Sequence, residues 1–284
     1  MGEVIEHNCL LAVAHNLHDA YSIAVALEHR GKDSTGLFAW GENGIDVLKW
    51  MGSVTDFGNK ALQRIFPAER YHTFGIHGRY RTRGSTEINL KESHPHVIGG
   101  LVEDKRNHIF IRGCEKALIH NGQIEEKYLA GVDKIKLQTN CDSEALLYYY
   151  DKFGIEAILN NIPDGYTLAI ADINNNGTIL CRGSRGLKPG ICGIKDGFDC
   201  FASESVALRE IRASLKGDLD PGSIYYLRPN GKISEPRQIV APIKRHCIFE
   251  VQYVAHPISL VDRLSVVVIR QDLGEKLAEE FHPK

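Results

Sequence analysis

The sequence predicts an α+β fold in which stacked, mainly antiparallel sheets are covered by helices. Two observations favour this class. Strand-like segments come first, helical segments fill the middle, and strand-like segments dominate again afterwards. A regular alternation of strand and helix, which is typical of parallel α/β sheets, does not occur. The length of 284 residues suits one large domain or two small ones.

The first half of the chain carries many of the expected strands. Apolar or β-branched runs of strand length lie at residues 9–14, 35–40, 45–50, 71–77, 108–112 and 117–120. A Gly-Glu-Asn-Gly turn between the second and third runs indicates a hairpin, and Gly113-Cys114-Glu115 indicates another between the last two. Helical spacing of apolar residues predicts helices over 18–29 and 54–65. The polar and basic stretch 77–92 predicts a shaped loop.

The second half begins with helices, predicted over 142–153 and 155–160. Strand-like runs separated by turn-forming residues follow at 166–173, 177–181, 198–202 and 223–227. A further helix is expected over 203–211. Residues 247–259 are expected to form a linker, and residues 264–277 are expected to form an amphipathic helix. The compact domain is therefore expected to be complete near residue 245.

Composition and charge argue against several function classes. Lys and Arg number 34 against 36 Asp and Glu, a formal charge of −2, which disfavours a nucleic-acid binder that relies on a basic face. No apolar run approaches the roughly 20 residues of a membrane span, and residues 1–8 lack the pattern of a signal peptide. The seven Cys include no CxxC pair, so neither a disulfide framework nor a structural zinc site is expected. We expect a soluble, cytoplasmic protein without metal or cofactor.

Four places could carry chemistry, and each also has a simpler explanation. Cys9 opens an apolar strand, where Cys usually serves as a small hydrophobic residue. Three of residues 79–83 are Arg, which suits carboxylates or phosphates, although basic loops are more often only solvated. The pair Asn121-Gly122 could donate two hydrogen bonds to an oxyanion, but Asn-Gly is more often a plain turn. Helix capping would by itself explain Asp142 or Asn140.

Taken together, these places form a series of motifs in a fixed order along the chain. The series consists of Cys9, His29-Arg30-Gly31-Lys32-Asp33-Ser34-Thr35-Gly36, Gly78-Arg79-Tyr80-Arg81-Thr82-Arg83-Gly84, His120-Asn121-Gly122-Gln123-Ile124, Cys141-Asp142-Ser143-Glu144 and Ala202-Ser203-Glu204-Ser205-Val206-Ala207-Leu208. It resembles the class II glutamine amidotransferases, which are N-terminal-nucleophile hydrolases. Among these, the sequence is most similar to the glutaminase half of amidophosphoribosyltransferase. The segment Cys247-Ile248-Phe249-Glu250-Val251-Gln252-Tyr253 is similar to the stretch that joins the two domains of that enzyme.

The resemblance implies a four-layer αββα sandwich, with two antiparallel sheets between helical layers. In the family, a Cys thiolate attacks the side-chain amide of glutamine and must be the first residue, because its α-amino group acts as the base. Residues 1–8 are therefore expected to be a propeptide whose removal frees Cys9. Asn121 and the N–H of Gly122 are expected to stabilise the oxyanion that the attack creates.

Free glutamine would be recognised through its two charges. Arg79 fills the family position that binds the α-carboxylate, and Asp142 fills the position that binds the α-ammonium group. Tyr80 and Thr82 are expected to line the same site. Arg30 is expected to hold the loop near Cys9.

The resemblance also divides the chain. Residues 9–245 match the glutaminase domain, and 246–284 match a linker and helix that in relatives lead into a phosphoribosyltransferase domain. The diphosphate-binding signature of that domain does not occur, and the stretches around Lys188, Gly222 and Pro257 depart from the family pattern.

We therefore expect a glutaminase that passes ammonia to a synthase partner of purine biosynthesis, either as a separate subunit or as part of a longer enzyme. A non-catalytic glutamine-binding sensor or assembly subunit that keeps its leader is the alternative. Both a monomer and a homo-oligomer fit the sequence.

Overall fold

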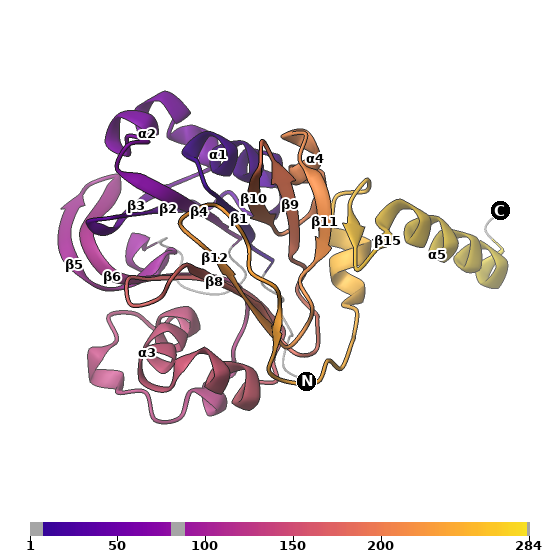
Figure 1. Ribbon diagram of the computed structural model, residues 1–284. Coiled ribbons are helices and arrows are strands. Elements are labelled where there is room, and N and C mark those ends of the chain that lie inside the picture. Colours follow the sequence, from indigo (N-terminus) through magenta and orange to yellow (C-terminus); the bar gives the residue numbers. More distant parts are fainter. Residues whose placement is uncertain (1–7, 81–88, 283–284) are drawn as a thin grey trace.

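The computed structural model describes residues 8–80 and 89–282 and contains a continuous 13-stranded sheet that folds into two layers (Figure 1). All its strand pairs are antiparallel. The first layer has the spatial order β11 (Ser214–Asp218), β9 (Ile191–Lys195), β10 (Phe198–Ala202), β1 (Leu10–Ala14), β4 (Tyr71–Arg79), β2 (Ser34–Gly41) and β3 (Gly44–Met51). The second continues with β6 (His108–Gly122), β7 (Tyr166–Asp172), β8 (Thr178–Arg182), β12 (Ser223–Leu227) and β13 (Arg237–Gln238), while β5 (His96–Lys105) pairs with β6.

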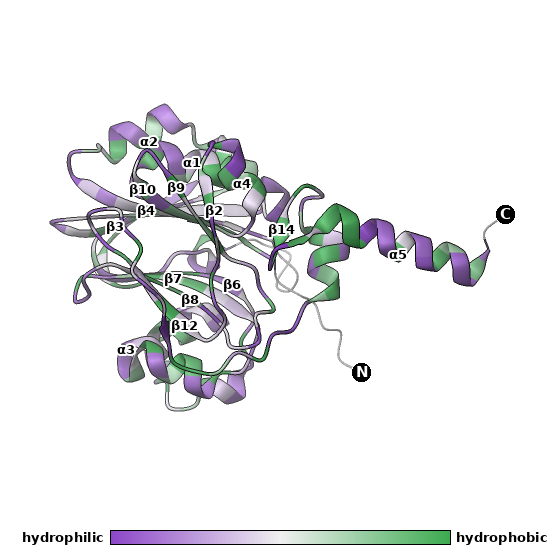
Figure 2. Cartoon of the chain, turned by 45° about the vertical axis from the view of Figure 1, so that its right-hand side comes forward, coloured by the Kyte–Doolittle hydropathy of each residue, from purple (hydrophilic) through white to green (hydrophobic). Residues whose placement is uncertain are grey.

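Helices cover both outer faces of this folded sheet (Figure 2). The first layer is covered by α1 (Leu17–Ala26), α2 (Asn59–Ile65) and α4 (Ser205–Glu210), and the second by α3 (Asp142–Asn161). The last helix, α5 (Val266–Phe281), projects away from the body after a small hairpin of β14 (Leu260–Val261) and β15 (Leu264–Ser265) (Figure 1).

Three separate apolar cores establish the four layers. Strand β1 shows how, because its side chains alternate between two of the cores. Leu10 and Ala12 pack with the helices α1 and α4, whereas Leu11 and Val13 pack between the two sheets. The third core lies between the second sheet and α3. The predicted α+β class and the αββα order of layers are therefore confirmed.

The hairpin predicted within residues 108–120 is wrong. These residues form one long strand, β6, in which Gly113 adopts φ +67° at an irregularity in the pairing rather than at a turn. The hairpin partner of β6 is β5, for which the sequence predicted no strand. Most of β5 is exposed, so its side chains lack the alternation of apolar and polar residues that reveals a half-buried strand.

Two other differences concern short elements. The helix predicted over 54–65 divides into a 3₁₀ turn at Val54–Asp56 and α2, and strands β9 and β11 were not predicted. The two helices predicted over 142–153 and 155–160 are confirmed, because α3 is interrupted at Gly154, where φ is +79° and ψ is 172°. After residue 245 the chain forms a π-helical turn, Glu250–Val254, and packs back against the body before α5 begins.

Candidate active site

Cys9 precedes β1 at one end of the sandwich. The antiparallel pairing of β1 with β4 sets Leu10 opposite Gly78, which brings the following residue, Arg79, close to Cys9. The Cys9 side chain is buried, its N–H donates to Oδ1 of Asn121 over 3.0 Å, and its Sγ accepts from the N–H of Tyr80. The nucleophile predicted from the sequence thus lies among three of the residues predicted to act with it.

The thiol of Cys9 is protonated in this environment. Burial raises its pKa, while the Tyr80 N–H and the positive charges of Arg79, Arg30 and Lys188 oppose the rise. Attack by the sulfur therefore requires a base that removes the thiol proton.

Asn121 and Gly122 end strand β6 beside Cys9. Because Oδ1 of Asn121 accepts the Cys9 N–H, its amide orientation is set, and Nδ2 is left as a buried donor without a partner among the described residues. Gly122 has φ +154°, and a Cβ there would lie 2.4 Å from the carbonyl oxygen of Gly165. Glycine is therefore required at position 122, and Asn121 has a donor to offer to a ligand.

The two charges predicted to bind glutamine come from different elements. Arg79 ends β4, and its guanidinium contacts the carboxylate of Glu92 at 3.4 Å. Asp142 opens α3, and its Oδ2 accepts from the N–H of Ile124 over 2.7 Å. Burial raises the pKa of Cys141 to about 12, Asp142 adds to the rise and Arg79 opposes it, so both charges lie close to this thiol.

Of the two residues predicted to line the glutamine site, Tyr80 lies beside Cys9 and Thr82 is not described by the structure. Tyr80 offers its backbone N–H to Cys9, while its side chain is 48% exposed. Thr82 lies outside the described residues, as do positions 1–7 of the expected propeptide. The N-cap of α3 is Cys141, so capping by Asp142 or Asn140 does not explain this motif.

Arg30 is fully buried and joins Cys9 to two acidic residues far along the chain. Its Nε donates to the Cys9 carbonyl oxygen over 3.3 Å, and its terminal nitrogens bond Glu204 at 2.5 Å and Glu250 at 2.5 and 3.1 Å. Glu204 also bonds His29 at 2.9 Å. The Arg30 side chain therefore contacts the backbone of the Cys9 segment directly.

Sequence reasoning did not assign roles to Glu204 and Glu250. Burial alone would raise the pKa of Glu204, but Arg30 and His29 outweigh it and hold the pKa well below its ordinary value. The charged form of Glu204 also accepts from the hydroxyl of Ser259 at 2.7 Å. Both acidic residues lie in segments that resemble the family, and this was the signal in the sequence that could have singled them out. No local pattern indicates that Arg30 is their partner.

Lys188, which also lies near Cys9, is a third residue to which the sequence assigned no role. Its ammonium group is buried and donates to Oδ1 of Asn8 over 2.8 Å, directly before the nucleophile. It comes from one of the stretches that depart from the family pattern. The stretch around Lys188 therefore contacts the residue before Cys9.

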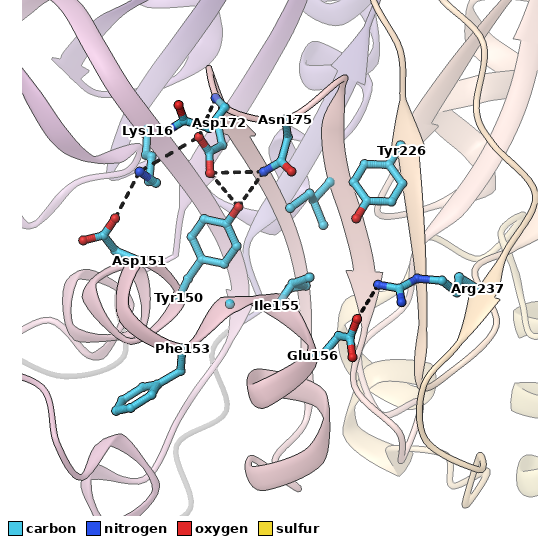
Figure 3. A pocket seen from close by; sticks show the side chains of 13 residues that line it. Lys116, Tyr150, Asp151, Phe153, Ile155, Glu156, Asp172, Asn175, Tyr226 and Arg237 are labelled. Atoms are coloured by element: carbon cyan, nitrogen blue, oxygen red, sulfur yellow. Dashed lines mark hydrogen bonds and ion pairs between the residues drawn. The ribbon is translucent and has the colours of Figure 1, made fainter.

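A separate pocket of about 600 Å³ lies beside α3 and β7 (Figure 3). Its polar groups pair mainly with one another: Tyr150 donates to Asp172 over 2.7 Å, Lys116 contacts Asp151 at 3.0 Å, and Arg237 contacts Glu156 at 2.7 Å. On the β6–β7 ladder, Lys116 and Asp172 are at the end opposite Gly122, roughly 20 Å away at the usual strand rise. This pocket is thus distinct from the Cys9 site.

Within residues 8–80 and 89–282, no group of His, Cys, Asp and Glu side chains is arranged to hold a metal ion. In the same part of the chain, no helix is long and apolar enough to cross a membrane.

Comparison with known proteins decides the family. The model of the glutamine amidotransferase domain matches residues 103–251, which is more than half of the chain. The chain belongs to this family. This glutamine amidotransferase domain is 29% identical to the amidophosphoribosyltransferase of Pseudomonas aeruginosa, over 93% of this chain and 54% of that enzyme. The Escherichia coli enzyme is 27% identical, over 96% of this chain and 55% of its own length, so the domain spans about half the length of these relatives.

Two solved structures share the fold of the amidotransferase domain. The glutamine phosphoribosylpyrophosphate amidotransferase of Bacillus subtilis, complexed with ADP and GMP, has a TM-score of 0.73 at 20% identity. A structure titled as the allosteric regulatory enzyme of purine biosynthesis has a TM-score of 0.73 at 21% identity. The match covers 97% of this chain in both cases, but 59% and 58% of the solved chains. The similarity confirms the predicted N-terminal-nucleophile hydrolase fold.

Proposed function

We propose that this amidotransferase domain hydrolyses L-glutamine to glutamate and ammonia through a thioester on Cys9. One observation carries the proposal, namely the hydrogen bond from the Cys9 N–H to Oδ1 of Asn121. It holds the nucleophile and the amide in a fixed relation and leaves Nδ2 of Asn121 as a buried donor. A donor of this kind, already oriented before reaction, is what a developing oxyanion requires.

The reaction begins when cleavage of the Asn8–Cys9 peptide bond turns the Cys9 nitrogen into an α-amino group. Such a group has a pKa near roughly 8 and can accept the thiol proton at neutral pH. The sulfur then attacks the side-chain amide carbon of glutamine, and the oxyanion accepts hydrogen bonds from Asn121 Nδ2 and the Gly122 N–H. The proton passes to the amide nitrogen, the C–N bond breaks and ammonia leaves. Water, deprotonated by the same amine, hydrolyses the thioester and restores the thiol.

Two opposite charges would select free glutamine. The Arg79 guanidinium suits the α-carboxylate, and the Asp142 carboxylate, already oriented by the Ile124 N–H, suits the α-ammonium group. Glutamine within a peptide lacks both charges and would be rejected. Tyr80 and Thr82 are proposed to line the same pocket.

We propose further that a synthase partner or domain consumes the ammonia. The relatives are named amidophosphoribosyltransferases, which favours a phosphoribosyl acceptor, and this chain spans about half of their length. Helix α5 projects from the body and exposes Leu277 and Phe281, which supports a contact with that partner (Figure 1).

The catalytic proposal is tested by the intact mass of the protein. The mass is measured before and after treatment with a glutamine-like diazoketone that alkylates active-site thiols. We expect a species that begins at Cys9, gains one adduct on Cys9, and is protected by free glutamine. Cys9→Ala should gain no adduct, whereas Cys181→Ala, which removes a buried thiol on β8, should react normally.

A non-catalytic glutamine-binding subunit is the second candidate. The burial of Asn8 and its hydrogen bond to Lys188 favour it, because they hold the residue that must be cut away. A full-length mass with no adduct, together with glutamine binding in calorimetry, would establish this function instead of hydrolysis.

A further inference from the structure

Four buried His side chains lie close together near the candidate active site: His77, His94, His96 and His120. His94 lies at the centre of the cluster. Its ring stacks on His77 with centroids 4.0 Å apart and an interplanar angle of 28°, and it meets His96 at 4.8 Å. These contacts are ring against ring, and the described residues offer no metal site here.

One hydrogen bond connects His77 of this cluster to strand β6, which ends in Asn121 and Gly122. Nε2 of His77 lies 3.0 Å from the carbonyl oxygen of His120, and because a carbonyl only accepts, Nε2 carries the proton. His120 directly precedes Asn121. A donor on β4 therefore holds β6 at the residue next to the one proposed to bind the oxyanion.

The ring of His120 continues the connection to α3. Its Nδ1 lies 2.8 Å from Oγ of Ser143, and that hydroxyl lies 3.4 Å from Oδ1 of Asp142. A carboxylate only accepts, so Ser143 donates to Asp142 and accepts from His120. One series of hydrogen bonds thus runs from His77 to the carboxylate proposed to bind the ammonium group of glutamine.

The rings of His77 and His94 are suited to a fixed role because they stay uncharged. Burial lowers the pKa of His77 to about 3, and burial together with neighbouring positive charge lowers that of His94 well below its ordinary value. His94 has no hydrogen-bond partner for either ring nitrogen among the described residues. Its contribution is the flat face that it packs against His77.

We propose that His77 and Ser143 are positioning residues that set the distance between Asn121 and Asp142, with His94 holding the ring of His77 in place. Neither residue touches glutamine in this arrangement. His77 acts on the oxyanion side through the His120 carbonyl, and Ser143 acts on the ammonium side through Asp142. The inference rests on the proposed function, because it assigns these supports to the glutamine site.

Substitutions of His77 and of Ser143 are expected to have different kinetic effects. His77→Phe keeps a flat ring but loses the donor, so kcat should fall at least 10-fold, since small misplacements of reacting groups are costly. His77→Gln restores a side-chain N–H and should recover kcat to within about threefold of the wild type. Ser143→Ala should raise KM for glutamine about 5- to 10-fold while kcat changes less than twofold, because Asp142 loses its support. His72→Phe, on the same strand but beside Trp40, is the matched control and should leave both constants unchanged.

A purely structural role would give a different pattern. Equal kcat for His77→Phe and His77→Gln, or an unchanged KM for Ser143→Ala, would overturn the proposal. Ser143→Ala removes only one oxygen atom and keeps the test available if His77→Phe does not fold. If the wild type binds glutamine without hydrolysing it, catalysis is refuted, and the dissociation constant of Ser143→Ala then decides the inference. A wild type that neither hydrolyses nor binds glutamine overturns both.

Discussion

The Nε of Arg30 donates to the carbonyl oxygen of Cys9 over 3.3 Å, and the rest of its guanidinium bonds Glu204 and Glu250. One buried cation therefore connects the candidate nucleophile to a residue 220 positions away from Arg30. Glu250 belongs to the π-helical turn that precedes the projecting helix α5. Arg30 thus links the backbone of Cys9 to the C-terminal segment of the chain.

Removal of Arg30 should destabilise the protein strongly. Arg30→Ala leaves the carboxylates of Glu204 and Glu250 buried without their cation, and we expect a loss of about 3 to 5 kcal/mol in the free energy of unfolding. Urea unfolding measures this loss. Arg112→Ala, which breaks the exposed pair with Glu103, is the control and should cost about 0 to 1 kcal/mol. Similar losses for the two variants would contradict a structural role for the Arg30 network.

Asn121→Ala should impair the chemical step rather than glutamine binding. Loss of one oxyanion donor typically lowers kcat about 100- to 1,000-fold, and KM should change little. Steady-state production of glutamate and ammonia separates the two constants. Asn175→Ala, in the separate pocket of Figure 3, removes an equivalent amide and should leave kcat unchanged. A rise in KM with normal kcat would assign Asn121 to binding instead.

Arg79 should recognise the α-carboxylate. Arg79→Ala is expected to raise KM for glutamine about 10- to 100-fold, because a charge-assisted hydrogen bond is lost. With the α-amide of glutamine, which lacks the α-carboxylate, the KM values of the wild type and Arg79→Ala should differ far less. Kinetics with both substrates measure this coupling. An equal effect on both substrates would show that Arg79 acts through the protein structure, for example through its contact with Glu92.

Stability should fall in mild acid because of the buried His cluster. The pKa values of His77, His94 and His96 lie below the unfolded value of about 6.5. As the pH falls below that value, the unfolded chain binds more protons than the folded protein does. The contribution of these His side chains to the free energy of unfolding is therefore complete above about pH 7 and is lost toward acid. The three groups together predict a decrease of about 4 kcal/mol between pH 7.5 and 5.5.

Urea unfolding at the two pH values checks this decrease. His94→Gln should reduce it by about one third. The window lies above the range in which Glu204 titrates, because the pKa of that carboxyl is held below its ordinary value by Arg30 and His29 against the effect of burial. A stability that does not change between pH 7.5 and 5.5 would show that the cluster is not buried in solution.

The sequence by itself determined the fold class and the candidate chemistry. Continuous apolar runs of strand length, such as the one that forms β1, revealed strands, and the order of motifs around Cys9, Asn121 and Asp142 indicated the family. Such features are readable because periodicity, turns and short motifs depend on neighbouring residues. The strand β5 was missed because its exposed side chains carry no such pattern.

Only the tertiary structure decided which distant charges and rings meet. The pairing of Arg30 with Glu250, the approach of Lys188 to Asn8, and the stacking of His94 on His77 join different segments of the chain. No local pattern specifies these contacts, because a buried charge or imidazole is stabilised by partners that only the packing of sheets and loops supplies. The sequence names the residues of the candidate site, and the layered fold sets the distances between them.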